Sequence, residues 1–162
     1  MADREFDIIV YGATGYTGRL VAEHFLREYG STVDGPKWAM AGRSLSKLEA
    51  VRDEIEAPET IPLVVADADD RTSLDAMCKR AKVILTTVGP YQLYGDALVA
   101  ACVATGTDYA DLCGEPAWMR EQIDLHHVAA GKSGSRITFS SGFDSIPFDL
   151  GVLMLQKEGI SR

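Results

Sequence analysis

Residues 7–18 read DIIVYGATGYTG, and this stretch decides the fold of the chain. It joins a short apolar run to an amphipathic segment that begins near Tyr16. Gly12 permits a sharp reversal after a buried strand, Gly15 lets a ligand approach the backbone, and Gly18 lets the next helix pack closely. The start of that helix offers free N–H groups and a positive dipole end. The stretch therefore predicts a phosphate-binding turn.

The glycine spacing alone is a weak signal, but its place between a strand and a helix makes it a strong one. Apolar runs and helical patterns alternate along the whole chain, which is typical of a parallel sheet covered by helices. We predict strands at 8–11, 38–41, 63–66, 83–87, 108–110 and 137–140. The prediction is an α/β fold of the Rossmann type, with a doubly wound parallel six-stranded sheet in three α/β/α layers.

Helices are expected between these strands. The first is predicted over 16–28, with an inner face made of Leu20, Val21, Phe25 and Leu26. Ser44 is expected to cap the second helix, and Asp96 is a natural cap for a helix that ends at Gly106. Pro116 suits the first turn of the next helix. An apolar helix over 148–156 follows the last strand.

Composition limits the classes of partner. The chain has 162 residues, 46% of them hydrophobic, and a net charge of −8, which oppose disorder and general attraction to nucleic acid. The start, Met1–Glu5, lacks an export signal, and the chain contains no apolar run long enough to span a membrane. We expect a cytoplasmic location. Cys78, Cys102 and Cys113 are scattered, so we expect reduced thiols and no metal site.

The end of the second predicted strand discriminates between dinucleotides. Folds of this type usually place an acidic residue there, which bonds the adenosine ribose hydroxyls. This chain has Gly42, followed by Arg43 and Ser44. A guanidinium group without a competing carboxylate suits a 2′-phosphate. We therefore predict NADP(H) as the preferred cofactor, with NAD(H) possible, and the alternative is that Arg43 is a solvated residue at a helix start.

Further contacts to the cofactor are expected from the ends of the third and fourth strands. Asp67 is placed to bond the adenine amino group, and Tyr91 and Tyr94 either cover the nicotinamide and meet substrate or pack internally. The complete predicted cofactor set is Gly12, Ala13, Thr14, Gly15, Tyr16, Thr17, Gly18, Arg43, Ser44, Asp67, Val88, Gly89, Pro90 and Tyr91.

No catalytic residue is assigned, and the candidates are Tyr91, Tyr94 and Asp144. Asp111, Glu115 and Asp144 follow the last two strands, where carboxylates orient substrate, relay protons or satisfy turn amides. No tyrosine has a lysine four residues later, which excludes for this segment the tyrosine-lysine mechanism of short-chain dehydrogenases. Cys113 has no basic neighbour in sequence, which disfavours a thiol nucleophile.

Five motifs together resemble the saccharopine dehydrogenase-like oxidoreductases, in particular the branch of trans-acting enoyl reductases. They are GATGYTG at 12–18, AGRS at 41–44, TVGPYQLYG at 87–95, TDYADLCGEP at 107–116 and SGFDSIPFDLG at 141–151. The resemblance implies an NADP(H)-binding domain over 1–145. It also implies that 146–162 begins the connection to a second domain, absent from this chain, which shapes the substrate pocket and often mediates homodimerisation.

The resemblance further implies that hydride is transferred to an enoyl or imine-type substrate, which is a small or a lipid-like molecule. It also implies a role in lipid biosynthesis and a full-length protein that can be peripheral to a membrane. The fragment alone is expected to be inactive. The alternatives are a non-catalytic NADP sensor of the NmrA type, a saccharopine reductase of lysine metabolism, and a structural domain that needs no cofactor.

Overall fold

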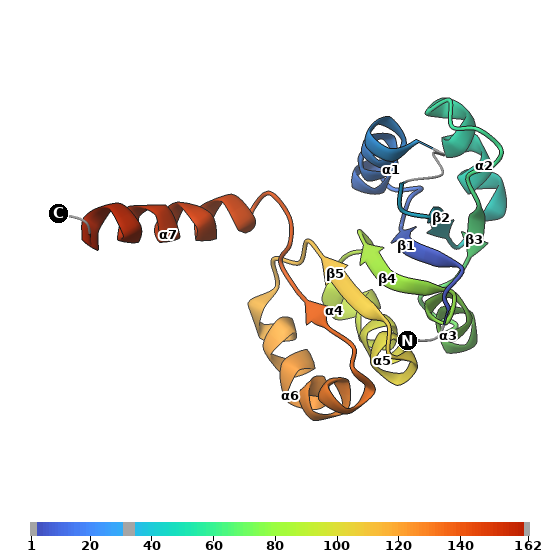
Figure 1. Cartoon of the computed structure of the whole chain (residues 1–162). Coiled ribbons are helices and arrows are strands. Elements are labelled where there is room, and N and C mark those ends of the chain that lie inside the picture. Colours follow the sequence, from blue (N-terminus) through green and yellow to red (C-terminus); the bar gives the residue numbers. More distant parts are fainter. Residues whose placement is uncertain (1–2, 31–34, 161–162) are drawn as a thin grey trace.

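A six-stranded parallel sheet forms the centre of the molecule in the computed structural model, which describes residues 3–30 and 35–160 (Figure 1). The strand order is β3-β2-β1-β4-β5-β6. The strands are β1 (Phe6–Tyr11), β2 (Trp38–Gly42), β3 (Leu63–Val65), β4 (Ala81–Thr86), β5 (Asp108–Asp111) and β6 (Ile137–Thr138). The predicted Rossmann-type fold is confirmed.

The helices alternate with the strands as expected. They are α1 (Tyr16–Tyr29), α2 (Leu45–Glu54), α3 (Arg71–Cys78), α4 (Tyr91–Tyr94), α5 (Asp96–Thr105), α6 (Pro116–Ser133) and α7 (Ile146–Ile160). Ser44 caps α2 by accepting a hydrogen bond from the backbone N–H of Lys47, and Pro116 occupies the first turn of α6, both as predicted. The short α4 was not predicted, because four residues are too few for a periodic pattern.

Two hydrophobic clusters lie on opposite faces of the sheet. Side chains of α1 and α2, such as Phe25 and Leu48, pack with Val10 and Met40 on one face. Helices α3, α5 and α6 cover the other face, where their residues pack with strand residues such as Ile84. Along β1 and β2, neighbouring positions thus point to different helical layers, as a doubly wound sheet requires.

Two predicted details are wrong. Leu20 is 42% exposed, and the buried residues of α1 are Gly18, Ala22 and Phe25, because close packing of Gly18 on the turn brings that side of the helix to the sheet. Asp96 does not cap α5. Its carboxylate instead accepts hydrogen bonds from the side chains of Trp118 and Gln122 on α6, so it joins two helices.

Helix α7 extends away from the rest of the molecule (Figure 1). It is longer than the predicted 148–156, and residues 161 and 162 at the end of the predicted connection lie outside the described residues, as do Met1 and Ala2. Within the described part of the chain, none of the helices has the length and apolar character needed to cross a membrane.

Candidate cofactor site

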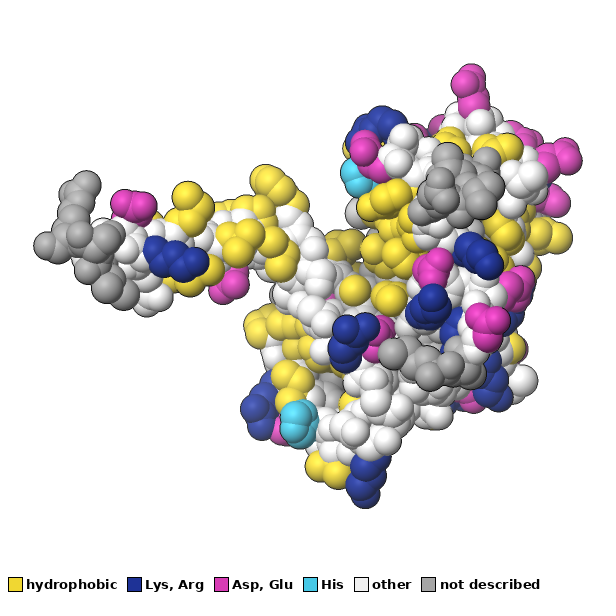
Figure 2. Space-filling model, viewed as in Figure 1, with side chains coloured by type: hydrophobic (Ala, Val, Ile, Leu, Met, Phe, Trp, Pro, Cys, Tyr) yellow, Lys and Arg dark blue, Asp and Glu magenta, His cyan; other side chains and the backbone are white. Residues whose placement is uncertain are grey.

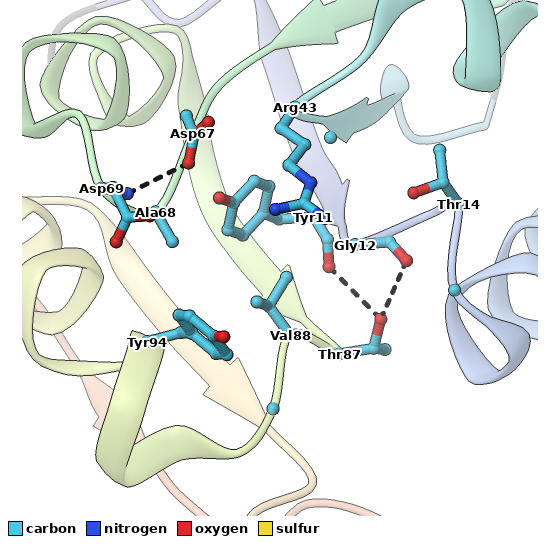
Figure 3. Close-up of a pocket in the computed structure, with 13 residues that line it drawn as sticks. Tyr11, Gly12, Thr14, Arg43, Asp67, Ala68, Asp69, Thr87, Val88 and Tyr94 are labelled. Atoms are coloured by element: carbon cyan, nitrogen blue, oxygen red, sulfur yellow. Dashed lines mark hydrogen bonds between the residues drawn. The ribbon is translucent and has the colours of Figure 1, made fainter.

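The turn between β1 and α1 is held on both sides by neighbouring strands. Gly12 has a φ of 91°, a conformation that favours glycine. Its carbonyl oxygen accepts hydrogen bonds from the N–H of Gly15 at 2.9 Å and from the hydroxyl of Thr87 at 3.3 Å (Figure 3). The N–H of Gly12 donates to the carbonyl of Ala41 in β2, 2.9 Å away. These bonds fix the turn over the first strand.

The start of α1 lacks a capping side chain. Gly15 occupies the cap position, and the first turn contains no acidic residue. By contrast, Ser44 caps α2 and Asp70 caps α3 by accepting a hydrogen bond from the N–H of Thr72 at 2.9 Å. The uncapped N–H groups and the dipole of α1 make its start a favourable position for an anion.

A cleft of about 280 Å³ opens beside this turn, at the carboxyl ends of β1, β2, β3 and β4. Dinucleotides bind at this position in open α/β sheets. Its lining residues are Tyr11, Gly12, Thr14, Gly15, Gly42, Arg43, Asp67, Ala68, Asp69, Thr87, Val88, Gly89 and Tyr94 (Figure 3).

Arg43 supplies the positive charge of the cleft. It follows β2 directly, and Figure 3 shows its side chain extending beside the ring of Tyr11. Among the residues that the structure describes, Arg43 forms no ion pair or side-chain hydrogen bond. Its guanidinium group is therefore available to a ligand, and Gly42 places no carboxylate next to it.

Asp67 and Asp69 lie in the cleft across from Arg43 (Figure 3). The carboxylate of Asp67 accepts a hydrogen bond from the N–H of Asp69 at 3.1 Å. Burial raises the pKa of Tyr11, and the two carboxylates raise it further, so its hydroxyl remains protonated at neutral pH. This end of the cleft presents both an acceptor, Asp67, and a neutral hydroxyl.

The two candidate tyrosines, Tyr91 and Tyr94, have different environments in the structure. Tyr94 lines the cleft and is 40% exposed. Tyr91 is buried, its ring lies 5.7 Å from that of Trp118, and its hydroxyl donates to the carbonyl of Thr86 at 3.3 Å. Burial raises the pKa of Tyr91 to about 12. The packing alternative therefore fits Tyr91, whereas Tyr94 lines the cleft.

The carboxylates after β5 satisfy turn amides, which was one of the two alternatives. Glu115 accepts hydrogen bonds from the N–H groups of Tyr91 and Gln92, at 2.8 and 2.9 Å, and so caps α4 from a distant loop. Asp111 accepts from the N–H of Ser140 at 2.8 Å. Asp144 is exposed in the loop before α7 and does not line the cleft.

Several other predicted cofactor residues do not line the cleft. Gly18 is buried, and a Cβ there would lie 2.0 Å from the carbonyl oxygen of Gly12. The remaining ones are Ala13, which is buried, Tyr16, Thr17 and Pro90, which are exposed, and Ser44, which caps α2. The prediction missed five lining residues: Tyr11, Gly42, Ala68, Asp69 and Thr87. Their position at strand ends was the signal that could have found them.

The three cysteines are free and buried. Burial raises the pKa of Cys113 to about 11, so this thiol is protonated at neutral pH and is a poor nucleophile. The described residues contain no group of three or more metal-ligating side chains.

The sequence of the chain matches the family model of the saccharopine dehydrogenase NADP binding domain over residues 8–137. The chain belongs to this family. The match covers the glycine turn, Arg43 and all six strands except Phe6 and Asp7 of β1 and Thr138 of β6. The predictions of the family and of NADP(H) as the cofactor are confirmed, and the family favours an oxidoreductase over a sensor of the NmrA type.

This saccharopine dehydrogenase-like domain is 51% identical over 161 residues to a trans-acting enoyl reductase of Mycobacterium tuberculosis. The alignment covers 98% of the chain and 37% of that relative, so the chain spans little more than a third of its length. Apo saccharopine dehydrogenase from Saccharomyces cerevisiae shares the fold, with a TM-score of 0.63 and 17% identity over 86% of this chain and 28% of that one. Triphenylmethane reductase from Citrobacter, solved with NADP(H), has a TM-score of 0.60 and 20% identity, over 82% of this chain and 48% of that one.

Proposed function

We propose that this domain serves an oxidoreductase that transfers hydride from NADPH to an unsaturated carbon, with an enoyl group as the substrate class. The observation that carries the proposal is Arg43, which pairs with no residue in the described part of the chain and lies in a cleft that also contains the uncapped start of α1. Two separate phosphate-binding features are what NADPH requires. The 51% identity to a trans-acting enoyl reductase supports the choice of an enoyl substrate.

In this proposal each part of the cleft has one role. The N–H groups at the start of α1 hold the diphosphate, and Arg43 holds the 2′-phosphate. Asp67 accepts from the adenine amino group, and Val88 and Gly89 lie along the nicotinamide ribose. NADPH supplies the hydride when it is bound.

Tyr94 is the group in this cleft that is suited to meet the substrate. Reduction of an enoyl thioester places negative charge on its carbonyl oxygen, and a hydrogen-bond donor there lowers the barrier. The Tyr94 hydroxyl is such a donor, and the side chain lines the cleft. Tyr91 and Asp144 lack this position.

We further propose that residues 1–145 are the dinucleotide-binding unit and that residues from 146 onward lead to a second domain that completes the substrate pocket. The proposed protein acts on a small or lipid-like substrate in the cytoplasm. The relative's greater length supports this division.

Calorimetric titration of the 162-residue chain with NADPH and NADH tests the cofactor site. We expect NADPH to bind at least tenfold more tightly. Equal affinity, or no binding of either dinucleotide, would refute the assignment of Arg43. Turnover requires the longer protein, with loss of NADPH absorbance followed in the presence of an enoyl thioester. NADPH binding without any enoyl reduction would leave only the sensor or imine-reducing alternatives.

A further inference from the structure

Residues 87–95, between β4 and α5, form one wall of the cofactor cleft. Val88, Gly89 and Tyr94 from this segment line the cleft, and Figure 3 shows the side chains of Val88 and Tyr94 there. In the proposed function, this wall lies along the nicotinamide half of NADPH. The conformation of the segment therefore decides how well that half of the cofactor fits.

The segment has little structure that is stable by itself. Its helix, α4, has four residues, and isolated helices of this length do not persist in water. Pro90 occupies the cap position of α4, and its side chain accepts no hydrogen bond from the first turn. The position of α4 therefore depends on contacts from other elements of the fold.

Glu115, which follows β5, binds the first turn of α4 with both carboxylate oxygens. Its Oε1 accepts a hydrogen bond from the N–H of Tyr91 at 2.8 Å, and its Oε2 accepts one from the N–H of Gln92 at 2.9 Å. Two bonds to one planar carboxylate fix orientation as well as distance. Glu115 also occupies the cap position of α6, but its side chain makes no capping hydrogen bond to that helix. The carboxylate therefore stabilises α4 and not α6.

The last turn of α4 packs on the same part of the fold. A Cβ on Gly95 would lie 2.3 Å from the indole ring of Trp118, and the ring of Tyr91 lies 5.7 Å from that ring. The start of α6 thus contacts α4 at both ends. Apolar packing is non-directional, whereas hydrogen bonds have a preferred angle. The two bonds to Glu115 therefore determine the orientation of α4.

The backbone of Glu115 is itself fixed to the end of β5. Its N–H donates to the Sγ of Cys113 at 3.3 Å, and the N–H of Cys113 donates to the carboxylate of Asp111 at 3.0 Å. Asp111 is the last residue of β5 and is buried. Pro116 follows Glu115 and restricts the backbone on its other side. The sheet thus sets the place of the carboxylate, and the carboxylate sets the place of α4.

We infer, on the basis of the proposed function, that Glu115 is a positioning residue for the nicotinamide half of NADPH and for Tyr94. It does not line the cleft, so it acts through α4 and not by contact with the cofactor. Arg43 and the glycine turn belong to other elements and do not depend on α4. Loss of the Glu115 carboxylate should therefore affect the nicotinamide end of the cofactor and spare the 2′-phosphate end.

Calorimetric titration of the 162-residue chain with NADPH and with adenosine 2′,5′-bisphosphate tests the inference. The second ligand has the 2′-phosphate and lacks the nicotinamide. We expect Glu115→Ala to weaken NADPH binding about tenfold and to leave the affinity for the bisphosphate unchanged. Glu115→Gln keeps the volume of the side chain but has one acceptor oxygen in place of two, so it should also lose NADPH affinity.

The matched control is Asp108→Ala at the opposite end of β5. The Asp108 carboxylate accepts a hydrogen bond from the backbone N–H of Arg136 at 2.8 Å, so this substitution also removes a bond to a distant backbone, but away from the cleft. We expect a lower Tm and unchanged affinity for both ligands. An equal loss of NADPH affinity in the control, or an equal loss for both ligands in Glu115→Ala, would reduce the effect to stability and overturn the inference.

Hydrogen exchange followed by mass spectrometry measures the position of the wall directly. Peptides that cover residues 87–95 should exchange faster in Glu115→Ala than in the wild type, and peptides of the glycine turn should not change. Figure 2 shows hydrophobic side chains over the projecting α7, so each comparison is made at two chain concentrations and must give the same difference at both. Equal exchange of residues 87–95 in the two chains would contradict the role of Glu115.

Steady-state kinetics of the longer protein tests the link to Tyr94. Glu115→Ala should raise KM for NADPH and lower kcat for enoyl reduction, whereas Tyr94→Phe should lower kcat alone. A wild-type kcat in Glu115→Ala would overturn the link. If the wild-type chain binds neither NADPH nor the bisphosphate, the proposed function fails and the inference fails with it. If the wild type binds both and Glu115→Ala binds NADPH equally well, the inference alone is wrong.

Discussion

A Cβ on Gly18 would lie 2.0 Å from the carbonyl oxygen of Gly12, so the first turn of α1 packs directly on the turn that follows β1. No side chain fits between these two backbones. The contact brings the uncapped start of the helix to the edge of the cleft. It also distinguishes Gly18, which has no room for a Cβ, from Gly15, which has.

The substitution Gly18→Ala should destabilise the domain, whereas Gly15→Ala should not. A Cβ on Gly15 would meet only the Gly12 carbonyl oxygen at 3.4 Å. Overpacking at Gly18 should cost about 1–3 kcal/mol, which corresponds to a fall in Tm of about 2–12 °C for a chain of this size. Thermal melting followed by circular dichroism measures both. Gly15→Ala should keep its Tm and bind NADPH more weakly, and equal Tm values for the two variants would contradict the contact.

Replacing Arg43 by alanine should weaken NADPH binding about 10- to 100-fold and leave NADH binding unchanged. Hydrogen bonds to a charged group contribute about 1.5–3 kcal/mol, and NADH lacks the 2′-phosphate. Calorimetric titration of both dinucleotides gives the two affinities. Arg120→Ala is the control, because Arg120 lies on α6 and pairs with Asp124. A parallel loss of NADH affinity would mean that Arg43 holds a part common to both cofactors.

Gly42→Asp should reverse the cofactor preference without loss of stability. The nearest atoms to a Cβ at this position are in Leu48 and Thr14, at 3.5 and 3.6 Å, which are ordinary contacts. A carboxylate here can accept from ribose hydroxyls and repels a 2′-phosphate. The ratio of NADH to NADPH affinity, measured with the thermal midpoint, tests this. An unaltered ratio in a folded variant would count against the proposed position of the adenosine ribose.

The two tyrosines of α4 should respond differently to substitution. Tyr91→Phe removes a buried hydroxyl that bonds the carbonyl of Thr86, and should lower stability by about 1 kcal/mol with unchanged NADPH affinity. Tyr94→Phe should leave stability unchanged and, in the longer protein, lower kcat for enoyl reduction. Urea denaturation and steady-state kinetics measure the two effects. If Tyr91→Phe alone lowered kcat, the roles given to these residues would be exchanged.

Asp111 should make the domain less stable as the pH rises. Burial raises the pKa of this carboxyl in the folded state above its ordinary value of 3.8, although hydrogen bonds from Tyr109, Cys113 and Ser140 oppose the shift. Between these two pKa values the folded state binds more protons than the unfolded state, so its stability falls with increasing pH. Above the raised pKa, this contribution is constant.

Asp111→Asn isolates the effect from that of carboxylates such as Asp7 and Asp108, whose pKa values are lowered and whose contributions have the opposite sign. The free energy of unfolding of the wild type, minus that of the variant, should decrease from pH 4 upward and then level off. Urea denaturation at a series of pH values gives this difference. A difference that grows with pH would show that the ionised carboxylate is favoured in the folded state.

Local sequence patterns were sufficient to predict most of the fold. The strand ending at Tyr11, the glycine turn, the cap at Ser44 and the proline at the start of α6 all depend on residues close together in sequence. The same holds for Arg43, because the position after the second strand of this fold is constant relative to the cleft. Predictions of this kind need backbone conformation and periodicity, and no information about distant packing.

The chain by itself therefore determined the parallel sheet, the family and the cofactor class, since each is encoded by short motifs in a fixed order. Only the tertiary structure decided that Tyr94 and not Tyr91 faces the cleft, that Glu115 caps α4, and that Asp96 joins α5 to α6. These outcomes depend on contacts between residues more than twenty positions apart. Such contacts are set by how helices pack on the sheet, which a local pattern does not specify.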